Sequence, residues 1–188
     1  SITAFRNFLQ ARIHKPGGIF FVETQIPDQA GAPFTLNDIK DFEEEFRTQY
    51  TEGDDMAVYI FFSNGSSSND TQTNVTLGTA YRNTSMVIYE STLRTITESD
   101  PVLLPILEQT TMQHEMGHIF GLVNIQNDDI HTAHEDPSAS KHCIVNECLM
   151  YFEATNLLRS EVTRFLRRGA VPQLDPLCIE DLQAKGGK

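Results

Sequence analysis

An HExxH sequence, formed by His114, Glu115 and His118, lies in the proline-free run of residues 109–120 and constrains this chain more than any other segment. Residues four apart share one face of an α-helix, so the two imidazoles can approach one metal ion. The glutamate, one position round the helix, can then reach a water beside that ion. HExxH also arises by chance on solvated helices, so the flanking sequence is needed to judge whether this one binds a metal.

Signals for the start and the end of a helix flank the motif. Asp100 can accept hydrogen bonds from the first helical turn, and Pro101 suits the first helical position. Gly121, three residues after His118, suits a left-handed C-terminal cap. We therefore predict one helix over residues 101–121 with the motif near its C-terminal end. Its apolar side is expected to face the core through Leu103, Leu104 and Leu107.

Two motifs together resemble those of a known enzyme clan. Gly121 extends the first motif to HExxHxxG, which resembles the metzincin zinc peptidases. A later block, from His142 and Cys143 to Cys148 and Met150, resembles the HCxxxxCxM sequence of the archaemetzincins. The resemblance implies a zinc hydrolase in which Glu115 is the general base. It also implies a methionine turn at residues 148–151 that places Met150 as an apolar floor beneath the metal.

The third metal ligand departs from the family pattern. Where the family has its third histidine, three residues after the glycine, this chain has Asn124, and an amide oxygen is a poor zinc ligand. We interpret residues 125–141 as an insertion that displaces the third ligand to His142, directly before the first cysteine of the block. His134, whose neighbours are acidic, is the alternative third ligand. Weaker possibilities are His131, Asn124 itself, Asp128, or loop histidines that are only solvated.

The sequence does not decide whether the three cysteines form a disulfide, stay as free thiols or bind a metal ion. Cys143 and Cys148 are close enough in sequence to form a small disulfide, which is the favoured interpretation and leaves Cys178 unpaired. Three free thiols are the second possibility. The family resemblance raises a third, because archaemetzincins bind a second, structural zinc through four cysteines. This chain would need a histidine such as His131 to complete that site.

The length and the net charge of the chain limit the number of domains and the partners that we expect. At 188 residues with 39% hydrophobic content, the chain is long enough for a core of its own, and we expect residues 1–188 to form a single metallopeptidase catalytic domain. A net charge of −12 argues against nucleic acid or an anionic membrane as a partner. No apolar run approaches a membrane span and no signal sequence is visible. We expect a secreted or cell-envelope domain after processing, with a cytoplasmic protein as the alternative.

The order of apolar segments predicts an α/β (α+β) fold. Residues 18–26 and 56–62 are patterned as buried strands with an acidic amphipathic helix over 36–50 between them, which indicates a βαβ unit. Two shorter strands are predicted at 75–81 and 85–89. We expect a metzincin-like, mixed and mostly parallel sheet with an antiparallel edge strand, packed on the active-site helix. Helices over 155–168 and 175–185 would form a helical C-terminal part.

These features together predict a zinc-dependent endopeptidase. Its Zn²⁺ is held by His114, His118 and His142, with His134 as the alternative, and Glu115 activates the water that attacks a peptide or protein substrate. One alternative is a non-catalytic binding or adhesion module on a metzincin scaffold, against which the intact glutamate counts. The other is a zinc hydrolase of a non-peptide amide or ester. Cleavage specificity and oligomeric state are not encoded in any motif.

Overall fold

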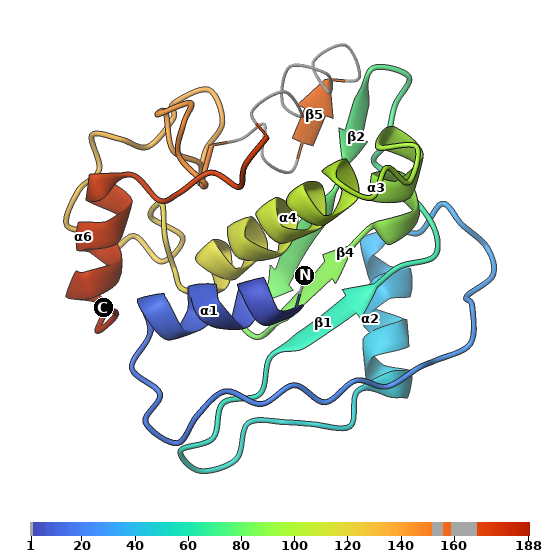
Figure 1. The fold of residues 1–188 in the computed structure, drawn as a ribbon, viewed down its shortest axis with the longest axis horizontal. Helices are drawn as coiled ribbons and strands as arrows, with labels where there is room; N and C mark the ends of the chain where they lie inside the picture. The colour runs from blue at the N-terminus through green and yellow to red at the C-terminus, as the bar shows by residue number, and fades with distance from the viewer. Residues whose placement is uncertain (1, 152–155, 159–168) are drawn as a thin grey trace.

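A computed structural model describes residues 2–151, 156–158 and 169–188, which form a mixed α/β fold (Figure 1). Its sheet has the strand order β1-β4-β3. The central strand β4 (Ser85–Ile88) pairs in parallel with β1 (Tyr59–Phe62) and antiparallel with β3 (Gly78–Arg82). The sheet is therefore mixed, with the antiparallel edge strand that the sequence predicts, but only one of its two pairings is parallel.

Alternation along the strands explains why helices cover both faces of the sheet. Met86 and Ile88 of β4 pack into the cluster that contains Leu107 and Met112 of helix α4 (Leu103–Ile119). Val87, between them, points to the opposite face and joins the cluster under helix α2 (Leu36–Phe46). Successive side chains of a strand point to opposite faces, so β4 needs apolar residues throughout, and all four of its residues are buried.

The remaining helices support this arrangement. Helix α1 (Ile2–Arg12) packs beside α4 and buries Phe5 and Leu9, as its helical spacing predicts. Helix α3 (Glu90–Ile96), which the sequence analysis did not predict, joins β4 to α4. Helix α6 (Pro176–Ala184) begins at the capping residue Asp175 and lies close to its predicted bounds. No helix in the described ranges is both long and apolar enough to cross a membrane.

The strand predicted over residues 18–26 is wrong. This segment runs as an irregular chain before α2, and two of its large apolar side chains, Phe20 and Val22, are 84% and 70% exposed. An apolar and β-branched composition favours a strand only where a partner strand is available, and no described strand pairs with this segment. The predicted βαβ unit therefore reduces to α2 followed by β1.

The strand predicted over 75–81 is divided in two. Strand β2 (Asn74–Thr76) leaves the main sheet and pairs antiparallel with β5 (Asn156–Leu158), while Gly78 begins β3. Strand β5 falls inside the helix predicted for residues 155–168, so that prediction is wrong over 156–158. Its other residues lie outside the described ranges. Local composition did not reveal this long-range pairing.

Candidate metal centre

Helix α4 ends in the way the glycine signal predicts. Gly121 has φ of +83°, its N–H donates to the His118 carbonyl, and the next N–H, of Leu122, donates to the Gly117 carbonyl. This pair of hydrogen bonds is a Schellman motif. At the other end, Asp100 Oδ1 accepts from the N–H groups of Val102 and Leu103, but residues 101–102 form a turn and the helix begins at Leu103, two residues later than predicted. These contacts at the two ends fix the helix so that the HExxH motif occupies its last turns.

Three histidine side chains converge beside the end of α4. The Nε2 atoms of His114 and His118 are 3.1 Å apart, and the ligand atoms of these two residues and of His142 all lie within 4.8 Å of one another. The His142 ring centroid is 5.3 Å from that of His114 and 5.1 Å from that of His118. The structure thus brings together the two helical histidines and the histidine that the sequence analysis ranked first as the third ligand.

Hydrogen bonds set which nitrogen of each ring faces the centre. His114 Nδ1 donates to the Leu149 carbonyl at 2.8 Å, and His142 Nδ1 donates to the Ser140 carbonyl at 3.0 Å. A carbonyl only accepts, so Nδ1 carries the proton and Nε2 keeps its lone pair in both rings. Burial, followed by the neighbouring His142, lowers the pKa of His118 to about 3, and burial also lowers the pKa of His114 and His142. The three imidazoles are neutral near pH 7.

This donor set fits a metal ion. Two imidazole nitrogens bound to one tetrahedral zinc at 2.0–2.1 Å lie about 3.3 Å apart, close to the 3.1 Å between His114 and His118 Nε2. His118 Nδ1 is buried without a hydrogen-bond partner among the described residues. The polar contact that this ring makes is therefore through Nε2. Two neutral imidazoles with Nε2 lone pairs, beside a third whose Nε2 faces them, are suited to hold a cation.

Glu115 lies beside the three histidines and is 2% exposed. Its Oε2 accepts a hydrogen bond from the Ala80 N–H of edge strand β3 at 2.6 Å. This contact requires α4 and β3 to approach closely, and Gly78 permits it. A Cβ atom at Gly78 would lie 2.7 Å from Thr111 Cγ2 and 2.9 Å from Glu115 Cγ. The absent side chain at Gly78 therefore makes room for the carboxylate.

Gly78→Ala is expected to displace Glu115 and to lower the free energy of unfolding by about 1–3 kcal/mol, because the added methyl group overpacks the α4–β3 contact. Urea unfolding of the purified variant measures this change. Gly17→Ala is the matched control, since a Cβ there meets no atom within 4 Å. Equal stability of the two variants would show that the contact is looser than described.

Met150 lies under the end of α4. It is fully buried, and a Cβ atom built on Gly117, which lies inside the HExxH motif, would collide with its Sδ. The residue before it, Leu149, supplies the carbonyl that orients His114. Met150 therefore packs against the helix that carries both helical histidines.

The loop of residues 125–141, interpreted above as an insertion, folds back on itself and holds His142 in place. Asn124 has φ of +59° and its N–H donates to Asp129 Oδ2 at 2.6 Å. The Lys141 Nζ donates to the Asn124 carbonyl, so the residue before His142 is tied to the end of the insertion nearer α4. The Asp136 N–H donates to the carbonyl of His142 at 2.8 Å. The loop is therefore closed at its base, with His142 turned toward the helix.

The other candidates for the third ligand lie elsewhere. His134, the alternative, faces away from His114 and His118: its Nε2 bonds to Asp181 Oδ2 of α6 at 2.9 Å. His131 Nε2 bonds to Glu180 at 2.8 Å. The Asn124 amide bonds to Glu135, and Asp128 pairs with Lys185. Each of these side chains is engaged by α6, by Lys185 at its C-terminal end, or by the same loop.

The favoured disulfide is not formed. Cys143, Cys148 and Cys178 are free and buried, and Cys148 Sγ lies 3.7 Å from Cys178 Sγ rather than bonded to Cys143. Hydrogen bonds with Cys143 and Cys178 lower the pKa of the Cys148 thiol to about 5. The histidine beside the thiols is His134 and not His131, and Asp175 lies there too. His134, Cys143, Asp175 and Cys178 form a second group of described side chains that could hold a metal ion, and Asp129, His134 and Asp181 form a third.

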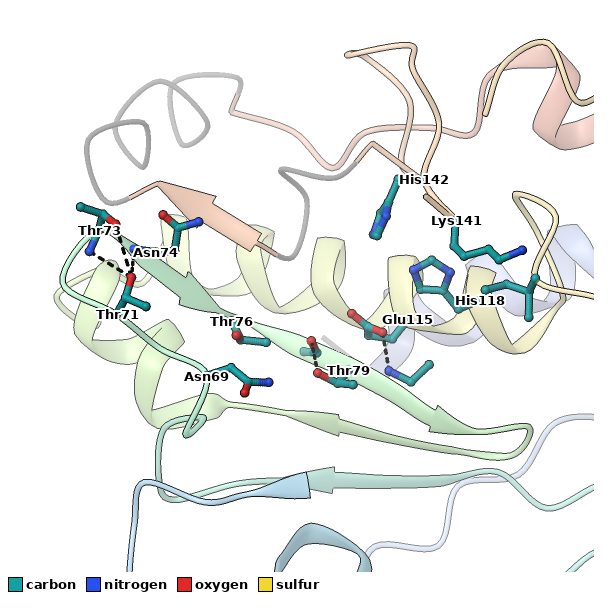
Figure 2. A pocket seen from close by; sticks show the side chains of 13 residues that line it. Asn69, Thr71, Thr73, Asn74, Thr76, Thr79, Glu115, His118, Lys141 and His142 are labelled. Carbon is teal, nitrogen blue, oxygen red and sulfur yellow. Dashed lines mark hydrogen bonds between the residues drawn. The ribbon is translucent and has the colours of Figure 1, made fainter. Parts of the chain in front are cut away.

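A cleft of about 660 Å³ opens in front of the first histidine group. Figure 2 shows His118, His142, Lys141 and Glu115 toward one end of it, with Thr71, Thr73 and Asn74 at the other. Edge strand β3 contributes Gly78, Thr79 and Ala80 to the wall between them. Because β3 pairs only with β4 among the described strands, its outer edge borders the cleft.

Comparisons with protein-family models, with curated proteins and with solved structures find no match for this chain. The interpretation of the site therefore depends on its own residues.

Several contributors to the site carry no signal in the sequence. The Leu149 carbonyl and the Ala80 N–H are backbone groups, and any residue type provides them. Asp181, fully buried behind His134, sits in an ordinary helical pattern 47 residues away. Gly117 could have been noticed as a glycine inside a regular element, where glycine often indicates a close approach of other atoms.

Proposed function

We propose that this chain is a zinc-dependent endopeptidase of the metzincin type. The observation that carries the proposal is the convergence of three neutral imidazoles, from His114, His118 and His142, beside a buried carboxylate at the wall of a cleft. Three histidines with an open fourth position are the donor set of a catalytic zinc. A structural zinc would be closed by a fourth protein ligand and would need no cleft.

Each residue has a distinct task in the proposed reaction. His114, His118 and His142 would hold the ion, which when bound supplies a Lewis acid that acidifies water and polarises a carbonyl. Glu115 takes the proton of the attacking water and returns it to the leaving amine. The Ala80 N–H holds one oxygen of that carboxylate in position, and the Leu149 carbonyl fixes the ring orientation of His114.

The edge of β3 favours a peptide as the substrate. An extended peptide can add to an exposed strand edge through backbone hydrogen bonds, which recognise any sequence. The edge of β3 borders the cleft next to Glu115, so a peptide paired with it would bring its carbonyl groups past the histidines. A small non-peptide amide or ester would make no use of this edge. This difference favours the endopeptidase over the other hydrolase.

Purified protein is expected to cleave members of a mixed peptide library and to lose that cleavage in the presence of a metal chelator, because the three imidazoles act only through the ion. Adding zinc back should restore cleavage. Mass spectrometry of the products identifies cut bonds and separates endopeptidase from exopeptidase action. Hydrolysis of small amides and esters without any peptide cleavage would favour the non-peptide hydrolase. Zinc binding without hydrolysis of either class would favour the binding module.

A further inference from the structure

A lysine directly after α6 reaches across to the loop that precedes His142. The aliphatic part of the Lys185 side chain lies over Gly121, where a Cβ atom would meet Lys185 Cδ at 3.7 Å and Cε at 3.8 Å. Its Nζ donates to Asp128 and lies 2.9 Å from Asp129 Oδ1. Lys185 therefore joins the C-terminal end of α6 to the end of α4 and to the loop that follows α4.

The two acidic residues that Lys185 contacts differ in burial. The Asp129 side chain is fully buried, whereas that of Asp128 is half exposed. An exposed ion pair contributes little, because water screens it. A buried carboxylate that loses its cationic partner is strongly unfavourable. Asp129 is therefore the partner through which Lys185 acts on the loop.

A chain of polar contacts leads from Asp129 to the third histidine. Asp129 Oδ2 accepts from the Asn124 N–H at 2.6 Å, and the Asn124 carbonyl accepts from Lys141 Nζ. In Figure 2 the Lys141 side chain extends away from the His142 ring. Lys141 has φ of +68° and directly precedes His142, so its anchored side chain sets the direction in which His142 enters the site.

Asn124 contributes to this chain through its backbone groups. Its N–H and its carbonyl make the two hydrogen bonds, in a left-handed conformation with φ of +59° that asparagine adopts more readily than most residues. Its side-chain amide bonds to Glu135 instead. The contacts with Asp129 and Lys141 therefore do not depend on the amide.

We propose that Lys185 is a positioning residue for the metal centre: paired with Asp129, it holds the loop so that His142 faces the two helical histidines. This role rests on the proposed function, in which His142 is the third ligand. A loop that is ordered in advance loses less conformational entropy when the ion binds, so the affinity for the ion is higher. Lys185 would thus act on the metal from the far side of the loop, without contacting it.

The test is the zinc affinity of the cleft, measured on the full chain by competition with a chelator. The binding step that His114→Ala removes identifies this site. Lys185→Met keeps an unbranched aliphatic side chain and removes the charge, and it is expected to lower the affinity about 10–100-fold. Lys185→Arg should restore most of it, because a guanidinium can still pair with the buried carboxylate. Lys188→Met is the matched control and should keep the wild-type affinity, since Lys188 Nζ donates to the Gln10 carbonyl of α1.

A double-mutant cycle separates positioning from a general effect on folding. In a His142→Ala background, Lys185→Met should change the affinity little, because the ligand that Lys185 positions is already absent. A lysine that only stabilised the fold would lower the affinity equally in both backgrounds. If Lys185→Met does not fold, Lys185→Met combined with Asp129→Leu leaves no unpaired buried charge and should show the same loss of affinity.

The outcomes distinguish this role from the proposed function. Wild-type zinc affinity in folded Lys185→Met or in the double variant with Asp129→Leu would overturn the positioning role and leave the proposed function intact. Equal losses with and without His142 would do the same. Absence of zinc binding by the wild-type chain would overturn the proposed function and the positioning role together.

Discussion

Glu115→Gln is expected to lower kcat/KM for peptide hydrolysis by about 10²–10⁴-fold while the metal content stays unchanged. Glutamine has nearly the same size, and its carbonyl oxygen can still accept from the Ala80 N–H, so the packing of α4 against β3 is preserved. What is lost is the group that takes a proton from water. Steady-state kinetics on a fluorogenic peptide, with zinc analysis of the same sample, measures both quantities.

Glu108→Gln provides the matched control for this substitution. Glu108 lies on the same helix seven residues earlier, is absent from the cleft lining, and interacts with Glu90 of α3. Its substitution should leave kcat/KM close to that of the wild type. Undiminished hydrolysis by Glu115→Gln would place the base on another residue and would remove the mechanism proposed above. Parallel loss in both variants would indicate damage to the helix.

His142→Ala is expected to weaken zinc binding at the cleft by more than the 10–100-fold that loss of a supporting contact usually costs, because it removes one of three ligands. Asn124→Ala, at the position where the family has its third histidine, should leave this ion in place. The affinity is measured by competition with a chelator. The Cys178→Ser background is suited to the measurement because it disables the thiol group that would otherwise compete for zinc.

His134→Ala distinguishes the two histidines that the sequence left as alternatives. In the same background it should change zinc affinity at the cleft only mildly, because its side chain faces Asp181 and the thiols. If His134→Ala abolished binding at the cleft and His142→Ala did not, the alignment through Cys143, Cys148 and Met150 would be wrong. The insertion would then adopt a different path over α4.

Features set by neighbouring residues could be predicted from the sequence. The C-terminal cap at Gly121 and the hydrogen bonds of Asp100 act within one turn of α4, so residue type and spacing were sufficient to predict them. The pairing of His114 with His118 is equally local, because helical geometry alone places them on one face. The place of His142 came from the spacing of the cysteine and methionine block and not from any energetic argument.

Features set by distant partners could not be predicted in this way. Residues 18–26 have a strand-like composition but find no partner, and Asn156–Leu158 forms a strand because β2 lies beside it. His134 and His131 carry similar local signals, and only the positions of Asp181 and Glu180 on α6 distinguish them. Pairing and burial depend on which segments meet in three dimensions, which composition does not reveal.

His142 and Cys143 are consecutive residues, yet the first faces the cleft group and the second faces the thiol group. One peptide unit therefore joins two of the places where described side chains could hold an ion. If an ion at either place orders this unit, the second ion encounters a chain that is already arranged, and its affinity rises. Thermodynamic reciprocity makes the enhancement equal in both directions. Zinc uptake by the metal-free chain would then be cooperative, so that the half-loaded protein would be less populated than two independent sites would give.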